Sequence, residues 1–192
     1  MLKKKEGATM HIIFSLLLLA LNIRKKTWRN LPKYYHVLIY VSVFNCLYYV
    51  LCRDFPMWEL KCKTLSARAV RILHILVVVP LLILLYLSNV PKSLSKQIVY
   101  ICKWIIVSMF VEFIGQKLKL ISFYNGWNLY WSILIYTKMY IYSMLMVKKP
   151  LLTWMISIVS TIFFLLMFKV PVKNNLKMQL AGCRSKIKFK YR

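Results

Sequence analysis

Six long apolar runs, separated by short segments rich in Lys and Arg, constrain the fold of this chain more than any other feature. A helix needs about 20 mostly apolar residues, with a range of about 17–25, to cross the hydrocarbon core of a bilayer. The six runs approach this length and cover residues 8–23, 34–52, 70–90, 98–114, 129–147 and 151–171. They predict an all-α fold in residues 1–172, a polytopic transmembrane helical bundle of about six spans, followed by a basic C-terminal tail at 173–192.

The first run is the weakest, because its apolar core is short and follows three lysines, which is also the layout of a signal peptide. No small-x-small cleavage site follows Leu21, and the next residues are Asn22-Ile23-Arg24-Lys25-Lys26. The sequence therefore favours a retained first span.

The charge of the chain is strongly unbalanced, with 29 Lys and Arg residues against 4 Asp and Glu and a net charge of +25. In a soluble protein this charge would indicate nucleic acid. Here 60% of the residues are hydrophobic, and the basic residues lie between the apolar runs and in the tail, where anionic lipid headgroups would meet them. We expect the lipid bilayer and its anionic headgroups as partners, and no nucleic acid. For the tail, a solvated disordered segment is the alternative to a membrane-bound one.

An even number of spans places both termini on one side of the membrane. Most of the Lys and Arg residues then lie on that side, which favours cytoplasmic termini by the positive-inside rule. The strongly basic loop at 24–33 lies on the opposite side and weakens the bias.

The sequence offers no set of residues typical of a catalytic or metal site. Five cysteines and three histidines form no CxxC or HxxxH pair. Sequences of the GxSxG, HExxH and Walker types do not occur, and four acidic residues leave carboxylate catalysis few positions. We expect no catalytic residue, no cofactor and no metal.

Pro80 lies inside the third run, in VVVPLLILL, whereas the other five prolines mark the borders of runs. A proline within a helix removes one N–H donor, and we expect it to free the carbonyl of Leu76 and bend the helix. A static bend is the simpler interpretation, because transmembrane helices tolerate proline.

Two charged residues within the runs are candidates for function, because a charge in hydrocarbon costs about 2.5–3.5 kcal/mol on insertion scales. Lys138 lies near the middle of the fifth run, without an obvious carboxylate partner at its depth. Lys103 lies nearer the end of its run and can extend its ammonium group toward the interface. Glu112 lies near the end of the fourth run, where an arginine or a set of hydrogen-bond donors would satisfy it.

The stretch FYNGWNLYWS at 123–132 enters the fifth run at the same membrane face as Glu112. Asn125-Gly126 predicts a turn, because both residues tolerate positive φ, and Asn128 or Asn125 can cap the next helix. Its tryptophans are typical of the headgroup zone. The stretch also predicts a polar cluster around the carboxyl group, and its candidate members are Glu112, Asn125, Trp127, Trp131, Arg68 and Arg71. A structural role for Glu112 and a role in substrate or proton handling both stay open.

The segment KQIVYICKWIIVSMFVEFIGQKLKLISFYNGWNLYWSILIY, followed by KKPLL at 148–152, resembles small uncharacterised multi-pass membrane proteins of Gram-positive spore-forming bacteria. The resemblance covers about 10–171 and leaves out the tail. It implies a shared Glu in the fourth span, here Glu112, and a shared NGWN-x-x-WS turn. Asn45 stands where the family favours an acidic residue, which weakens any two-carboxylate mechanism. The resemblance implies a protein of the bacterial plasma membrane and no activity.

Three function classes remain. The first is an integral membrane protein with a non-enzymatic structural or interaction role, and the alternative is a small transporter or channel component that uses Lys138 and Glu112. An enzyme acting on lipids is the third, and it lacks a recognisable catalytic set. A pocket that joins Lys138 to Glu112 would favour transport, whereas a dry bundle would favour the structural role. No internal repeat of the kind common in transporters is present.

Overall fold

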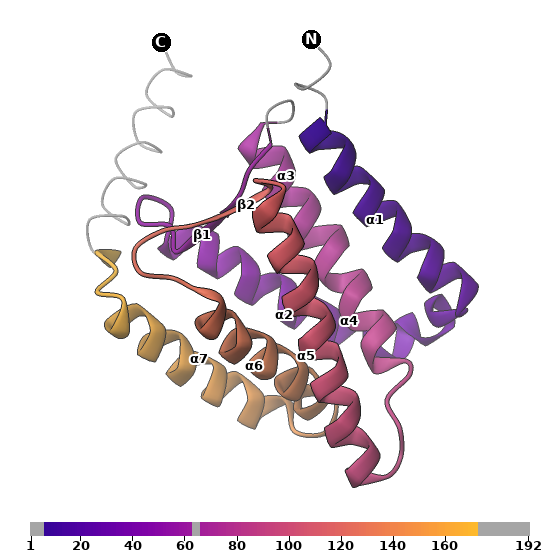
Figure 1. Ribbon diagram of the computed structural model, residues 1–192. Coiled ribbons are helices and arrows are strands. Elements are labelled where there is room, and N and C mark those ends of the chain that lie inside the picture. Colours follow the sequence, from indigo (N-terminus) through magenta and orange to yellow (C-terminus); the bar gives the residue numbers. More distant parts are fainter. Residues whose placement is uncertain (1–5, 63–65, 173–192) are drawn as a thin grey trace, which may run out of the picture.

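The protein is described by a computed structural model that covers residues 6–62 and 66–172 (Figure 1). The tail predicted at 173–192 lies outside the described residues, as do the three lysines near the N-terminus. The elements in chain order are α1 (Glu6–Arg24), a 3-10 turn (Thr27–Asn30), α2 (Leu31–Leu51), β1 (Trp58–Leu60), α3 (Ala67–Leu73), a π-helical turn (His74–Val78), α4 (Val79–Leu87), α5 (Leu94–Lys117), β2 (Ile121–Phe123), α6 (Leu129–Lys148) and α7 (Pro150–Met167).

Helices occupy the positions of the six apolar runs. The segments α3, the π-helical turn and α4 follow one another without a break, so the described part of the chain forms six long helical segments, each overlapping one run. Proline stands in the first turn of α2, α4 and α7, where a missing N–H costs little. The all-α fold class is confirmed, with one small sheet in addition.

The core of the bundle is centred on α4, which packs against α1, α2 and α6. Six of its nine residues are buried. Tyr86 of α4 and Tyr140 of α6 are fully buried, with ring centroids 4.6 Å apart. Helices α5 and α7 pack on either side of α6, which therefore has neighbours on several faces (Figure 1).

Small hydroxyl residues are buried where helices meet. Ser108 of α5 hydrogen-bonds the Tyr140 hydroxyl of α6 at 2.6 Å, and Ser157 of α7 hydrogen-bonds the Tyr40 hydroxyl of α2 at 2.5 Å. Interfaces of this type, with small residues and interhelical hydrogen bonds, are characteristic of helices packed in a membrane.

The outer faces of the bundle are apolar. Ile98, Ile106 and Phe110 of α5 are between 63% and 67% exposed, and α7 presents a similar row that includes Leu151, Val159 and Leu166. Within the described residues, four helical segments are long and apolar enough to cross a membrane: Thr27–Leu51, Ala67–Leu87, Leu94–Lys117 and Pro150–Met167. The apolar part of α1, Met10–Arg24, is shorter. The protein is therefore a membrane protein, since lipid is the solvent that such faces require.

A two-stranded antiparallel sheet joins two connections at one end of the bundle. β1 follows α2 and β2 follows α5, and Glu59 lies opposite Ser122 in the register. Backbone hydrogen bonds continue the pairing on both sides, from Lys61 N to Leu120 O at 2.7 Å and from Tyr124 N to Met57 O at 2.8 Å. The sheet fixes the segment that leads into α6, and with it the stretch FYNGWNLYWS.

The π-helical turn lies directly before Pro80 and changes which carbonyl group loses its donor. The N–H of Val79 donates to His74 O, five residues back, so it does not reach Ile75 O. Pro80 has no N–H to take its place. The hydroxyl of Ser42 on α2 donates to Ile75 O at 3.0 Å instead. The sequence predicted that the carbonyl of Leu76 would lose its donor. Because the π-helical turn is one residue wider than an α-helical turn, the carbonyl that needs a side-chain donor is that of Ile75 instead.

The hydrogen bond from Ser42 to Ile75 O predicts a measurable effect on stability. We expect Ser42→Ala to lower the free energy of unfolding by about 1 kcal/mol, because it leaves the part-buried carbonyl of Ile75 without this donor. Ser88→Ala is the matched control: the Ser88 hydroxyl is buried and has no hydrogen-bond partner among the described residues. Its expected effect is within about 0.5 kcal/mol. Unfolding of the full chain in mixed micelles measures both, and equal losses would contradict the assignment.

Candidate functional site

Lys138 lies near the middle of α6, with its ammonium group among aromatic rings from three helices. Nζ is 6.0 Å from the ring centroid of Phe44 on α2, 5.7 Å from that of Tyr142 on α6 and 5.8 Å from that of Phe164 on α7. Ring faces attract a cation by about 0.5–2 kcal/mol each. No ion pair within residues 6–62 and 66–172 involves Lys138, so its ammonium group has no carboxylate within 4.0 Å there.

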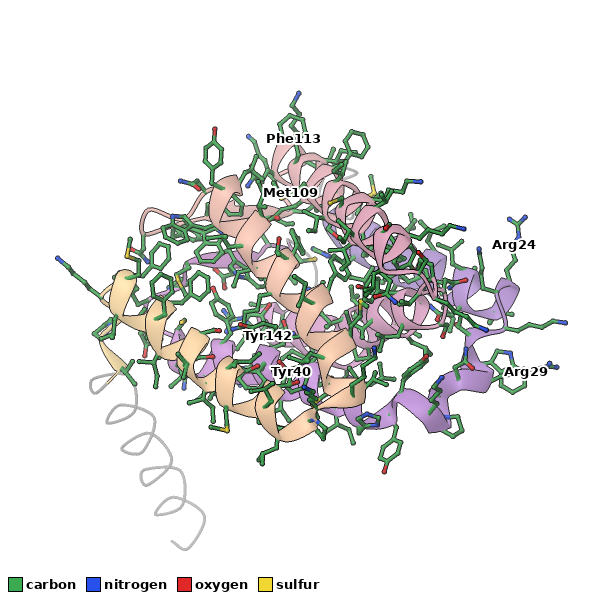
Figure 2. The ribbon with its side chains drawn as sticks, turned by 90° about the horizontal axis from the view of Figure 1, so that it is seen from below. Arg24, Arg29, Tyr40, Met109, Phe113 and Tyr142 are labelled. Atoms are coloured by element: carbon green, nitrogen blue, oxygen red, sulfur yellow. The ribbon has the colours of Figure 1, made fainter. Side chains whose placement is uncertain are left out.

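The rings and Lys138 line a cavity of about 170 Å³, which we call the Lys138 pocket. Helices α2, α6 and α7 form its sides, and Met57, Trp58 and Trp127 line the end nearest the sheet. The labelled rings of Tyr40 and Tyr142 lie in the interior of the bundle, whereas Arg24 and Arg29 project from its edge (Figure 2). The pocket is thus a mainly aromatic and aliphatic cavity within the helical bundle.

Several other polar groups in the lining already form hydrogen bonds within the protein. The Tyr142 hydroxyl hydrogen-bonds Ser160 Oγ at 2.9 Å, and the side-chain amide of Asn45 donates to Val41 O at 2.8 Å. Lys138 is the one side chain among the described lining residues that is ordinarily charged at neutral pH. An entering molecule therefore meets a single positive charge in an apolar wall.

Trp127 connects the pocket to Glu112. Its ring lines the pocket and is 6% exposed, and its Nε1–H donates to Ser132 Oγ at 3.1 Å. The Ser132 hydroxyl in turn donates to Glu112 Oε1 at 2.9 Å. Glu112 itself does not line the pocket, because Ser132 faces α5 while Lys138 lies on another side of α6. The Lys138 pocket therefore does not extend to Glu112, whereas a pocket that joins the two residues directly would have favoured transport.

The Glu112 carboxyl group is buried, as expected, with a side chain that is 6% exposed. The hydroxyl of Tyr136, one turn after Ser132 on α6, interacts with the same group. Oε2 of Glu112 and Nε2 of Gln116 are both buried, and neither has a hydrogen-bond partner among the described residues. Two helices therefore contribute four polar side chains to one buried location.

The arginines expected near Glu112 are elsewhere. Arg71 forms a short ion pair with Glu59 of β1, at 2.5 Å, and its guanidinium group lies over the Tyr49 ring. Arg68 is exposed at the start of α3. Of the two alternatives for Glu112, the arginine pair is absent among the described residues, because the sheet brings Glu59 to Arg71, and a hydrogen-bond donor is found instead.

The remaining members of the predicted cluster shape the turn into α6. Asn125 and Gly126 have φ values of 52° and 79°, and the Asn125 amide donates to Pro56 O at 2.7 Å. Asn128 Oδ1 caps α6 by accepting from the N–H groups of Tyr130 and Trp131. The turn and the cap are confirmed.

Trp131 packs against Trp127 and Phe168 without joining the hydrogen-bond chain to Glu112. Of the cluster predicted around Glu112, the structure therefore brings only Trp127 to it, through Ser132.

Sequence reasoning missed Ser132 and the rings around Lys138. Tyr142 lies four residues after Lys138 on the same helix, so a shared face was a usable signal. Phe44 and Phe164 come from other helices, and their approach depends on how α2 and α7 are rotated about their axes. Neighbouring aromatic residues are too common in this chain to single them out.

The fold and the apolar outer faces define a helical membrane protein. No protein-family model matches the chain, and searches of curated proteins and of solved structures found no match. Within the described residues, His, Cys, Asp and Glu form no group of three that could hold a metal ion.

Proposed function

We propose that this chain is a non-enzymatic integral protein of a bacterial plasma membrane that binds a small apolar carboxylate in the Lys138 pocket. It crosses the membrane six times, with both termini in the cytoplasm. The apolar outer faces and the distribution of Lys and Arg support this placement. The ligand-binding role combines the interaction role and the transport role, since both a receptor and a transporter must first bind a ligand.

The observation that carries this proposal is the half-buried side chain of Lys138, whose ammonium group faces a cavity and has no carboxylate within 4.0 Å among the described residues. A purely structural lysine at this depth would be costly, and intramembrane charges of this kind mark binding sites. The aromatic rings stabilise the cation without neutralising it. A carboxylate entering the pocket would add a charge-assisted hydrogen bond in a medium of low dielectric constant.

The lining also selects the kind of anion. One lysine offers one positive charge, so a monoanion is matched and a phosphate dianion is left with an unpaired charge. The remaining walls are aromatic and aliphatic, including Val41, Ile135, Met139 and Leu165, and they favour an apolar body attached to the carboxylate. A fatty-acid anion of short or medium chain length has these two properties.

Titration of the full chain in lipid nanodiscs with octanoate tests the proposal. We expect octanoate to bind, n-octanol to bind more weakly and octylamine to be excluded, because only octanoate complements Lys138. Lys138→Gln should weaken octanoate binding about tenfold or more, equivalent to about 1.4 kcal/mol. Lys103→Gln is the matched control, since Lys103 is also a lysine of a membrane helix but is exposed and outside the pocket lining. Equal octanoate affinities of the wild type and Lys138→Gln would overturn the proposal and leave Lys138 with a structural role.

A further inference from the structure

The carboxyl group of Glu112 forms a second buried polar location, on the α5 side of α6. It accepts a hydrogen bond from Ser132 Oγ at 2.9 Å and interacts with the Tyr136 hydroxyl. No ion pair within the described residues involves Glu112, so its negative charge is not neutralised by an Arg or Lys within 4.0 Å there. A buried ionised carboxylate is costly unless a positive charge lies beside it, and no such charge is present here among the described residues.

Two further atoms at this location point to a missing partner. Glu112 Oε2 is buried and has no hydrogen bond, and Gln116 Nε2 is buried and has none either, among the residues described. Residues four apart lie on one face of a helix, so these two side chains are neighbours on α5. Buried polar groups are ordinarily paired, which makes two unpaired groups on one helix face an observation that needs a cause.

The groups that face Glu112 do not supply a positive charge. On α6 the titratable groups are Tyr136 and, one turn further, Tyr140, whose hydroxyl is engaged with Ser108. Strand β2, which also packs against α5, has no ionisable side chain. On α5 itself, Lys117 directs its ammonium group over the ring of Phe113, away from the interface with α6 (Figure 2 shows Phe113 on the outer surface).

We propose that Glu112 binds an exchangeable monovalent cation, a proton or a sodium ion, together with the side-chain oxygens of Gln116, Ser132 and Tyr136. Carboxylate, amide and hydroxyl oxygens are ligands that suit a hard cation, and rotation of the Gln116 amide presents its oxygen. A proton on Oε2 neutralises the same charge. Glu112 is five residues from the end of α5, or about 8 Å along the helix axis, so the site lies within reach of the aqueous interface. The proposal does not depend on the ligand of the Lys138 pocket.

Labelling with dicyclohexylcarbodiimide tests the site, because the oxygen of a protonated carboxyl group in a membrane adds to the central carbon of this apolar reagent and the carboxyl proton passes to its nitrogen. The full chain in nanodiscs is treated at acidic to alkaline pH, with sodium chloride or an equal concentration of choline chloride, and the labelled carboxyl group is located by mass spectrometry. We expect labelling at Glu112 that falls about tenfold for each pH unit above the midpoint of the site. Protection by sodium, but not by choline, identifies a sodium site, and labelling indifferent to sodium identifies a proton site.

Trypsin cleaves after Lys and Arg, and the tryptic peptide 104–117 contains Glu112 and no other acidic residue, so the wild-type protein alone gives the assignment. Glu112→Gln should lose the label, and Glu59→Gln should keep the label at Glu112, because Glu59 pairs with Arg71 instead. Gln116→Leu should reduce sodium protection while the pH-dependent label remains. Absence of label at Glu112 at every pH, or label that depends on neither pH nor sodium, would overturn the proposal.

Discussion

Tyr86→Ala is expected to lower the free energy of unfolding by about 3–5 kcal/mol, since it removes a large aromatic side chain from a well-packed core. Tyr86 is fully buried at the centre of the bundle. Its ring centroid lies 5.3 Å from that of Tyr100, 5.6 Å from that of Trp104 and 4.6 Å from that of Tyr140. Unfolding of the full chain in mixed micelles, followed by circular dichroism, gives the loss directly.

Tyr35→Ala is the control for this experiment, because Tyr35 is 56% exposed on α2. Its expected effect is within about 0.5 kcal/mol. A small loss for Tyr86→Ala, similar to that of the control, would mean that α4 is not the centre of the bundle and that the helices are arranged differently.

Trp127→Ala is expected to have a second large effect, again about 3–5 kcal/mol, and to alter the Lys138 pocket as well. The Trp127 ring packs against Phe164 and Phe168, with centroids 6.1 Å and 5.2 Å away, and forms part of the pocket wall. Its removal also takes the donor from Ser132. We therefore expect octanoate affinity to change together with stability.

Two variants separate the packing of Trp127 from its hydrogen bond. Trp127→Phe keeps a ring in the wall but lacks the N–H group, so its expected cost is nearer 1 kcal/mol. Trp28→Ala removes a tryptophan that is 57% exposed and should leave both stability and octanoate binding nearly unchanged. Unfolding and octanoate titration of the three variants provide the measurements. Equal behaviour of Trp127→Ala and Trp28→Ala would show that Trp127 does not support the pocket wall.

The positions of the helices could be predicted from the sequence, because bilayer thickness fixes the length of an apolar run that spans it. The turn at Asn125-Gly126 and the cap at Asn128 could also be predicted, since both depend on local backbone chemistry. The burial of Glu112 followed from the cost of placing a carboxylate against lipid.

The pairings between distant segments could not be predicted in the same way. Strands β1 and β2 have three residues each, too few for a period-two pattern to be recognised, and they are far apart in the chain. Because the sheet was not predicted, the sequence could not indicate that Arg71 pairs with Glu59 and not with Glu112. The rings around Lys138 depend on the rotation of α2 and α7, which hydrophobicity alone does not fix in a chain so rich in aromatic residues.

The position of a bound carboxylate tests the central claim most directly. Crystals of the full chain soaked with 8-bromooctanoate would show the bromine atom by anomalous scattering and the carboxylate in the density. The expected result is bromine among the apolar residues of the Lys138 pocket, with a carboxylate oxygen about 2.7–2.9 Å from Lys138 Nζ. Bromine found only along the lipid-facing sides of α5 and α7, with the pocket closed around Lys138, would contradict the account.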